Sequence, residues 1–175
     1  PKPSIAFATS NVFLSDNRSS QIGTLYFTDS QIFGPVVSVR GYAFFSTNTL
    51  SFPHSLTLSN ADMRLMTGMT VNVHGDFNLT KTTRFDIPAG PTNVGMDYGS
   101  VLDVDGDIFI YTNCELRPYS DPTNGGSLRM TMNNLTIGAG GANNADGGGY
   151  AAENGPGAGY GWLSCGGGYG GRGAR

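Results

Sequence analysis

The chain has 175 residues, of which 13% are charged, and a formal net charge of −3; a typical soluble domain is about a quarter charged. Its two lysines, Lys2 and Lys81, argue against nucleic-acid binding, because neutralising phosphates requires clustered Lys and Arg. No apolar run of about 18 residues occurs, so no membrane span is predicted. Because the chain begins at Pro1 and not at Met, we interpret it as a processed chain or a fragment.

In chain order, the first predicted elements are short β segments. Each is rich in Val, Ile, Phe, Tyr and Thr, which suit a pleated, half-buried surface. They span residues 24–29, 36–45, 69–79 and 101–111. No apolar series with helical spacing is found, and Gly, Pro, Asn and Asp interrupt the chain too often for a long helix. The sequence therefore predicts an all-β protein.

Two of these segments are copies of one motif. VNVHGDFNL (71–79) and LDVDGDIFI (102–110) both read apolar, polar, Val, polar, Gly, Asp, apolar, any, apolar. We interpret LTLSNADMRL (56–65) as a looser copy with one extra residue, and MTMNNLTI (130–137) as a copy one residue shorter. Because such a unit buries its apolar face only by stacking on a neighbouring copy, spacings near 30 residues predict a solenoid.

The predicted fold is thus an all-β, right-handed parallel β-helix with a glycine-rich C-terminal extension. Solenoid coils are expected over 56–137, and glycine- and tyrosine-rich coils or a loop extension over 138–175. Residues 1–55 are β-rich and form either earlier coils or a separate small sandwich.

The segment DVDGD (103–107) places carboxylates on alternate positions around a glycine, which makes Asp103, Asp105 and Asp107 weak calcium candidates. A calcium loop needs glycine at its sixth position and glutamate at its twelfth, where this chain has Ile108 and Cys114. Because the Gly-Asp pair recurs in the other copy and the full carboxylate set does not, we interpret the pair as a β corner in which Asp bonds nearby backbone N–H groups. No metal or cofactor is expected, and the predicted corner residues are Gly75, Asp76, Gly106 and Asp107.

Three N-x-[ST] sequons are glycosylation candidates, at Asn17, Asn78 and Asn134. The alternation of the β segments points Asn78 and Asn134 outward. The cysteines, Cys114 and Cys165, lie outside any CxxC motif. A disulfide between them and two unpaired buried thiols are both compatible with the sequence.

The chain contains 27 glycines, and 16 of them fall in residues 138–175. The motifs GGSLRMTMNNLTIGAGG, NADGGGYAAENGPGAGYG and GGGYGGRG, within about 125–173, resemble glycine-rich segments of very large extracellular proteins of protists, algae and some bacteria. One setting for such segments is the mastigonemes, the glycoprotein hairs of flagella. The resemblance implies a parallel β-helix in a cell-surface, matrix or filament protein, and it supplies no catalytic residues.

We therefore expect a non-catalytic structural component of an extracellular filament, sheath or cell-surface matrix. Its expected partners are other copies, or other segments of the same large chain. One alternative is an adhesin or fibre binding module. Another is a carbohydrate-active β-helix lyase or hydrolase, whose charged residues would come from Arg84, Asp86, Asp97, Asp103, Asp105, Asp107, Glu115 and Arg117. Both histidines, His54 and His74, are interpreted as turn or corner residues.

Overall fold

The computed structural model describes residues 24–27, 33–38, 40–45, 48–92 and 98–151. These residues contain fifteen strands and no helix, and every strand pairing is parallel. The all-β prediction is therefore confirmed.

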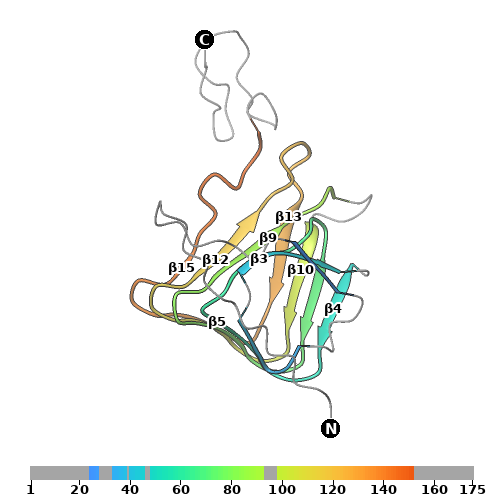
Figure 1. The fold of residues 1–175 in the computed structure, drawn as a ribbon. Helices are drawn as coiled ribbons and strands as arrows, with labels where there is room; N and C mark the ends of the chain where they lie inside the picture. Colours follow the sequence, from blue (N-terminus) through green and yellow to red (C-terminus); the bar gives the residue numbers. More distant parts are fainter. Residues whose placement is uncertain (1–23, 28–32, 39, 46–47, 93–97, 152–175) are drawn as a thin grey trace, which may run out of the picture.

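The strands form three sheets (Figure 1). The six-stranded sheet contains, in spatial order, β1 (Thr24–Phe27), β3 (Arg40–Phe45), β6 (Asp62–Arg64), β9 (Arg84–Pro88), β12 (Glu115–Tyr119) and β15 (Ala142–Asn143). The five-stranded sheet contains β14 (Leu135–Ile137), β11 (Ile108–Ile110), β8 (Phe77–Thr80), β5 (Leu56–Ser59) and β2 (Val36–Val37). The four-stranded sheet contains β13 (Ser127–Thr131), β10 (Tyr98–Val104), β7 (Thr70–Val73) and β4 (Thr49–Phe52).

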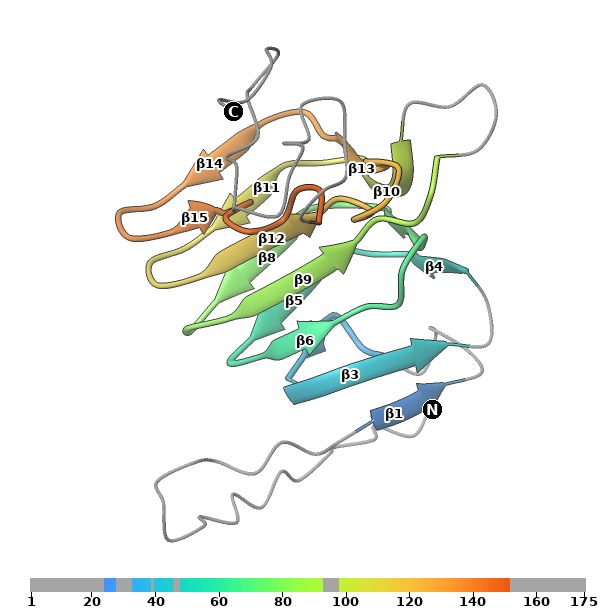
Figure 2. The ribbon, with the colours of Figure 1, turned by 90° about the horizontal axis from the view of Figure 1, so that it is seen from above.

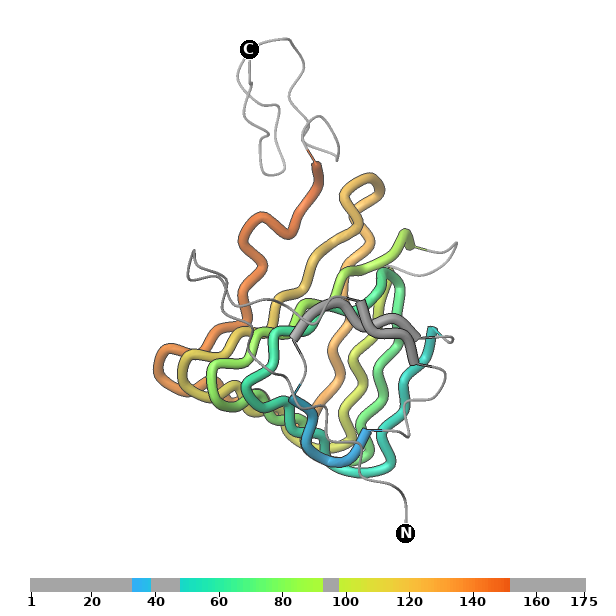
Figure 3. Tube along the Cα trace, viewed as in Figure 1, coloured from blue at the N-terminus to red at the C-terminus, as the bar shows by residue number. Residues whose placement is uncertain are grey.

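From β4 onward, each run of three consecutive strands visits the three sheets in the same order. We call such a run a round; the four rounds are β4–β6, β7–β9, β10–β12 and β13–β15. Each round lies directly beside the one before it, so the sheets grow along one direction from the blue to the orange end of the chain (Figures 2 and 3). Strands on both sides of residue 55 belong to the same sheets.

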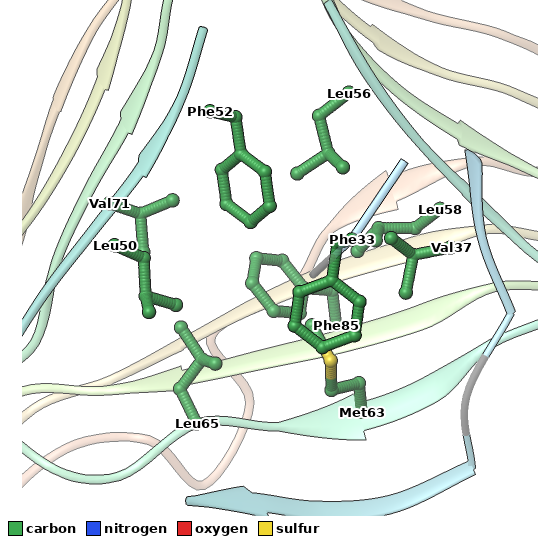
Figure 4. Close-up of a pocket in the computed structure, with 10 residues that line it drawn as sticks. All are labelled: Phe33, Val37, Leu50, Phe52, Leu56, Leu58, Met63, Leu65, Val71 and Phe85. Atoms are coloured by element: carbon green, nitrogen blue, oxygen red, sulfur yellow. The ribbon is translucent and has the colours of Figure 1, made fainter. Parts of the chain in front are cut away.

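Side-chain alternation fills the space between the sheets. Val71, Val73, Phe77 and Leu79 are at most 1% exposed, whereas the polar residues between them reach solvent, as the alternation predicts. At the N-terminal end of this interior, ten apolar side chains surround a cavity of only 10 Å³ (Figure 4). That volume is at the lower limit for one water molecule, so this part of the core is closely packed.

The strand register shows that one of the predicted copies of the motif was misaligned. The segments at 71, 102 and 130 do align, since Val71 pairs with Leu102 and Leu102 with Met130. The partner of Val71 in the round before is Leu50, however, while Leu56 pairs with Phe77. The segment equivalent to VNVHGDFNL (71–79) is therefore LSFPHSLTL (50–58). The predicted copy at 56–65 was wrong, because its first strand pairs with the second strand of the 71–79 segment and not with the first. The segment 50–58 has Pro-His-Ser at its corner in place of a Gly-Asp pair, which concealed the relationship.

Candidate functional site

A ladder of polar side chains runs along the corner between the four-stranded and five-stranded sheets. The backbone N–H of Asp76 donates to Ser55 Oγ at 2.9 Å, and that of Asp107 donates to Asp76 Oδ1 at 3.0 Å. Asn134 Nδ2 then donates to Asp107 Oδ1 at 2.8 Å. Asp76 Oδ1 therefore accepts a backbone N–H at this corner, and each round contributes one member of the ladder.

Close approach between rounds explains the glycines beside this ladder. Gly106 N donates to Gly75 O at 3.0 Å, and a Cβ built on Gly106 would overlap Asp76 Oδ1 and lie 2.9 Å from Gly75 C and O. Gly75 has φ +154°, and its Cβ would lie 2.7 Å from Ser55 N. A side chain at either position would force adjacent rounds apart. The structural-corner assignment therefore rests on steric exclusion as well as on hydrogen bonding.

The DVDGD carboxylates do not converge. Asp103 lies on β10, Asp105 is exposed and contacts His74, with Nδ1 to Oδ2 at 2.9 Å, and Asp107 belongs to the ladder. Within the described ranges, no group of three His, Cys, Asp or Glu side chains is placed to hold a metal ion. His74 occupies the corner position equivalent to that of Asp105, as expected, and His54 donates from Nδ1 to Ser55 O at 3.0 Å if that nitrogen carries the proton.

The other charged candidates gather on the outer face of the six-stranded sheet. We call this the charged face; its described members are Asp62, Arg64, Arg84, Asp86, Glu115, Arg117 and Tyr119. Charges alternate across the strands, since Asp62 pairs with Arg84 and Arg84 with Glu115, while Asp86 lies between Arg64 and Arg117. Both Arg64 and Arg117 stack on the Tyr119 ring, at 5.1 and 5.3 Å from its centroid.

Asp86 is the unusual member of the charged face. Its side chain is only 6% exposed, and Oδ1 lies 3.6 Å from Arg84 Nε without a hydrogen bond. Desolvation raises the pKa of this carboxyl above its ordinary value of 3.8, and the nearby cations Arg84, Arg117 and Arg64 only partly offset that effect. Sequence reasoning included Asp86 among eight charged residues but had no signal for its burial, which depends on side chains from other rounds.

The geometry brings only half of the predicted catalytic set together. Arg84, Asp86, Glu115 and Arg117 share the charged face, while the three DVDGD carboxylates lie on β10 and the opposite corner, and Asp97 lies outside the described residues. A groove of 460 Å³ adjoins the charged face and is lined by Asp62, Thr82, Thr83, Arg84, Asn113, Glu115 and Gly140. Arg84 separates Asp62 from Glu115 in the strand register there, so no carboxylate pair is formed across one strand step.

The round β13–β15 exposes apolar side chains at positions that are buried in the round before it. Leu135 pairs with Ile108 and Ile137 with Ile110. Ile108 and Ile110 are 0% and 1% exposed, but Leu135 and Ile137 are 40% and 44% exposed. Among the described residues, β13 and β14 each pair on one side only. We call the side of these two strands that faces away from β10 and β11 the C-terminal edge; on β14 it presents the apolar side chains of Leu135 and Ile137.

The candidate glycosylation sites and the cysteines differ in how exposed they are. Asn134 is exposed at the corner before β14, Asn78 is half-buried in β8, and Asn17 lies outside the described residues. Cys114 is a buried free thiol; its Sγ accepts from Thr83 N at 3.4 Å. Its predicted disulfide partner Cys165 also lies outside the described residues.

The described part of the chain forms no helix with the length and apolar character needed to cross a membrane. Comparison with protein-family models, with curated proteins and with solved structures finds no match.

Proposed function

We propose that this chain is a segment of a right-handed parallel β-helix that serves as a structural, non-catalytic component of an extracellular filament, sheath or cell-surface matrix. Its sheets grow by adding parallel rounds, and assembly proceeds through stacked rounds of its own chain or of other copies.

The C-terminal edge is the observation that carries this proposal. Leu135 and Ile137 continue two columns of buried side chains yet remain 40% and 44% exposed. An exposed edge strand with apolar side chains is a template for further pairing unless it is blocked by charge, Pro or a bulge. β14 reads Leu-Thr-Ile and contains none of these. Burying both side chains would contribute roughly 1–3 kcal/mol, at about 25 cal/mol per Å² of apolar surface.

The charged residues on the outer surface favour a structural role for this chain over a catalytic one. Described charges on the six-stranded sheet occur in alternating ranks, with ion pairs such as Arg84 Nε to Asp62 Oδ1 at 3.5 Å and Arg117 Nε to Glu115 Oε2 at 3.8 Å. An extracellular setting is also compatible with the exposed sequon at Asn134, although Asn134 Nδ2, the atom that would carry the glycan, donates to Asp107.

Sedimentation velocity over a range of concentrations, followed by negative-stain microscopy, tests the structural proposal. We expect elongated species whose mass grows with concentration, and we expect Leu135→Asp to suppress that growth by placing a charge at the C-terminal edge. Thr136→Asp, on the outward side of the same strand, is the matched control. A compact monomer at every concentration would count against assembly.

One observation favours the carbohydrate-active alternative as a second candidate: the buried carboxyl of Asp86 has a raised pKa beside arginines and near a polar groove. A screen of the full chain against polysaccharides of neutral and acidic sugars decides between the two. Turnover that is lost in Asp86→Asn, with the fold retained, would make this second function the leading one.

A further inference from the structure

The outer face of the five-stranded sheet differs in chemistry from the charged face. Its strands β5, β8, β11 and β14 lie side by side (Figure 2), and none of their outward side chains is Asp, Glu, Lys, Arg or His. The inward side chains of β5, β8 and β11 are buried, and the outward ones reach solvent. We call these outward side chains, together with Tyr111 directly after β11, the uncharged face; its members are Thr57, Ser59, Asn78, Thr80, Phe109 and Tyr111.

The strand register sets the uncharged face out in straight ranks. Thr57 pairs with Asn78, Asn78 with Phe109, and Phe109 with Thr136 on β14. These pairings contain no register shift, whereas the pairing of β10 with β13 does. Three strand spacings separate the first and last members of this rank, so it extends over about 14 Å. A surface with this regularity suits an extended ligand that lies across the strands.

An aromatic pair lies within this otherwise polar surface. The rings of Phe109 and Tyr111 have centroids 6.3 Å apart and planes inclined by 29°. Phe109 is half-buried and Tyr111 is 50% exposed. Tyr111 lies between Thr80 and Gly138, because Ile110 pairs with Leu79 on one side and with Ile137 on the other. Since Gly138 has no side chain, nothing at that position covers the ring from the side of β14.

A sugar matches this combination of groups. A pyranose ring presents C–H groups on its faces and hydroxyls around its rim. The faces of aromatic rings carry negative charge density that attracts such C–H groups, and hydroxyl and amide side chains can donate to and accept from sugar hydroxyls. Thr80 Oγ1 donates to Leu58 O at 3.4 Å and keeps its lone pairs for accepting. An uncharged ligand is favoured, because a charged group brought onto this face would find no counter-ion there.

Other macromolecules match the uncharged face less well. Nucleic acid requires Lys or Arg beside the stacking rings, and these strands have neither at their outward positions. A stable contact with a second copy buries about 800 Å² on each partner around an apolar centre. Among the described outward residues of this sheet, apolar surface is confined to the ring pair and to Val36, three strands away on β2. The hydroxyls and the amide between them would lose hydrogen bonds to water in such a contact.

We propose that the uncharged face binds a neutral polysaccharide, with sugar rings on Phe109 and Tyr111 and sugar hydroxyls on Asn78 and Thr80. The ligand lies across the strands, along the direction in which rounds are added. This binding adds a ligand to the structural role, and it does not depend on assembly of the chain.

Affinity gel electrophoresis of the full chain tests the proposal. The gels contain either a neutral polysaccharide (β-glucan, xylan or galactomannan) or an acidic one (alginate or polygalacturonate). The chain is produced in a host that does not N-glycosylate, because a glycan on Asn78 would cover the same rank. We expect at least one neutral polysaccharide to retard the chain, with an affinity that is unchanged between about 50 and about 500 mM salt, since screening acts only on charges.

Variants locate the binding surface. Tyr111→Ala and Phe109→Ala should each weaken binding by about tenfold or more, because each removes one stacking ring. Tyr111→Phe keeps the ring and should retain most of the affinity. Tyr150→Ala is the matched control, since Tyr150 is 42% exposed and lies outside the uncharged face; it should bind as the parent does. Circular dichroism of each variant verifies that the fold is retained.

Three results would overturn the inference. The first is migration unaffected by every neutral polysaccharide, and the second is undiminished binding by folded Tyr111→Ala and Phe109→Ala. The third is stronger retardation by an acidic polysaccharide that fades with salt, which would place the site on the charged face. If no polysaccharide binds and Tyr111→Ala instead reduces self-association in sedimentation velocity, a second copy occupies this face. Binding by a chain that never assembles would uphold the inference and remove the structural proposal.

Discussion

Replacing Gly106 with alanine should destabilise the protein far more than a surface glycine substitution does. The new Cβ would overlap Asp76 Oδ1 and approach Gly75 C and O to 2.9 Å. Relief requires the two rounds to separate at the corner, which costs about 1–3 kcal/mol for overpacking. It also removes the bond from Asp107 N to Asp76 Oδ1, about 1 kcal/mol. We therefore expect a loss of about 2–4 kcal/mol in the free energy of unfolding.

Urea denaturation followed by circular dichroism measures this loss. The control is Gly34→Ala, because a Cβ at Gly34 has no atom within 4 Å, and we expect a change within about 0.5 kcal/mol there. A double-mutant cycle with Asp76→Ala isolates the contact, since removing the carboxylate should recover part of the Gly106→Ala cost. Equal effects of the Gly106 and Gly34 substitutions would refute the steric account of the corner.

Four further outcomes follow from the same contacts. Because folding raises the pKa of Asp86, the contribution of this carboxyl to stability is fully present below its ordinary pKa of 3.8 and is lost as pH rises through the folded pKa. In thermal melts at pH 7, Asp86→Asn should therefore be at least as stable as the parent chain, and this advantage should vanish toward pH 4. Strong destabilisation of Asp86→Asn at pH 7 would contradict this. Ile110→Ala should cost about 2–5 kcal/mol in urea titrations because Ile110 is 1% exposed, whereas Tyr111→Ala, at a 50% exposed position beside it, should cost less than about 1 kcal/mol. Since the DVDGD carboxylates do not converge, millimolar Ca²⁺ should leave the melting temperature unchanged, and a rise abolished by Asp103→Asn would show an ion site. Asp105→Asn should change stability by no more than about 1 kcal/mol at any pH between 5 and 8, because the His74 contact is exposed on both sides; a larger loss in melts would show that this pair holds the corner.

Sequence reasoning identified the strands on either side of the two Gly-Asp corners, β7, β8, β10 and β11, because their alternating apolar residues and the corner glycines are local signals. In the six-stranded sheet it included β1 and β3 among the expected β segments but did not identify β9 and β12. There the outward positions hold charged residues, and Pro88 and Pro118 lie within β9 and β12, a residue that usually argues against a strand. A period-two signal was nevertheless present in Phe85 and Ile87, both at most 2% exposed.

The candidate site was less accessible to sequence reasoning. The ladder from Ser55 to Asn134 joins residues from four rounds, and no short-range pattern shows that Ser55 and Asp76 are equivalent. The burial of Asp86 arises from its strand neighbours Arg64 and Arg117, with Tyr119 stacked on both. Such relationships depend on register between rounds of unequal length, which the sequence did not specify on its own.

Electron cryo-microscopy of the concentrated chain tests the central claim most directly, that parallel rounds continue beyond β15 to build a structural element. The account predicts elongated particles with an axial repeat near 4.8 Å, the spacing of paired strands, and continuous density on the far side of β13 and β14. A compact particle whose last ordered strands are β13 to β15, with Leu135 and Ile137 facing solvent, would contradict it.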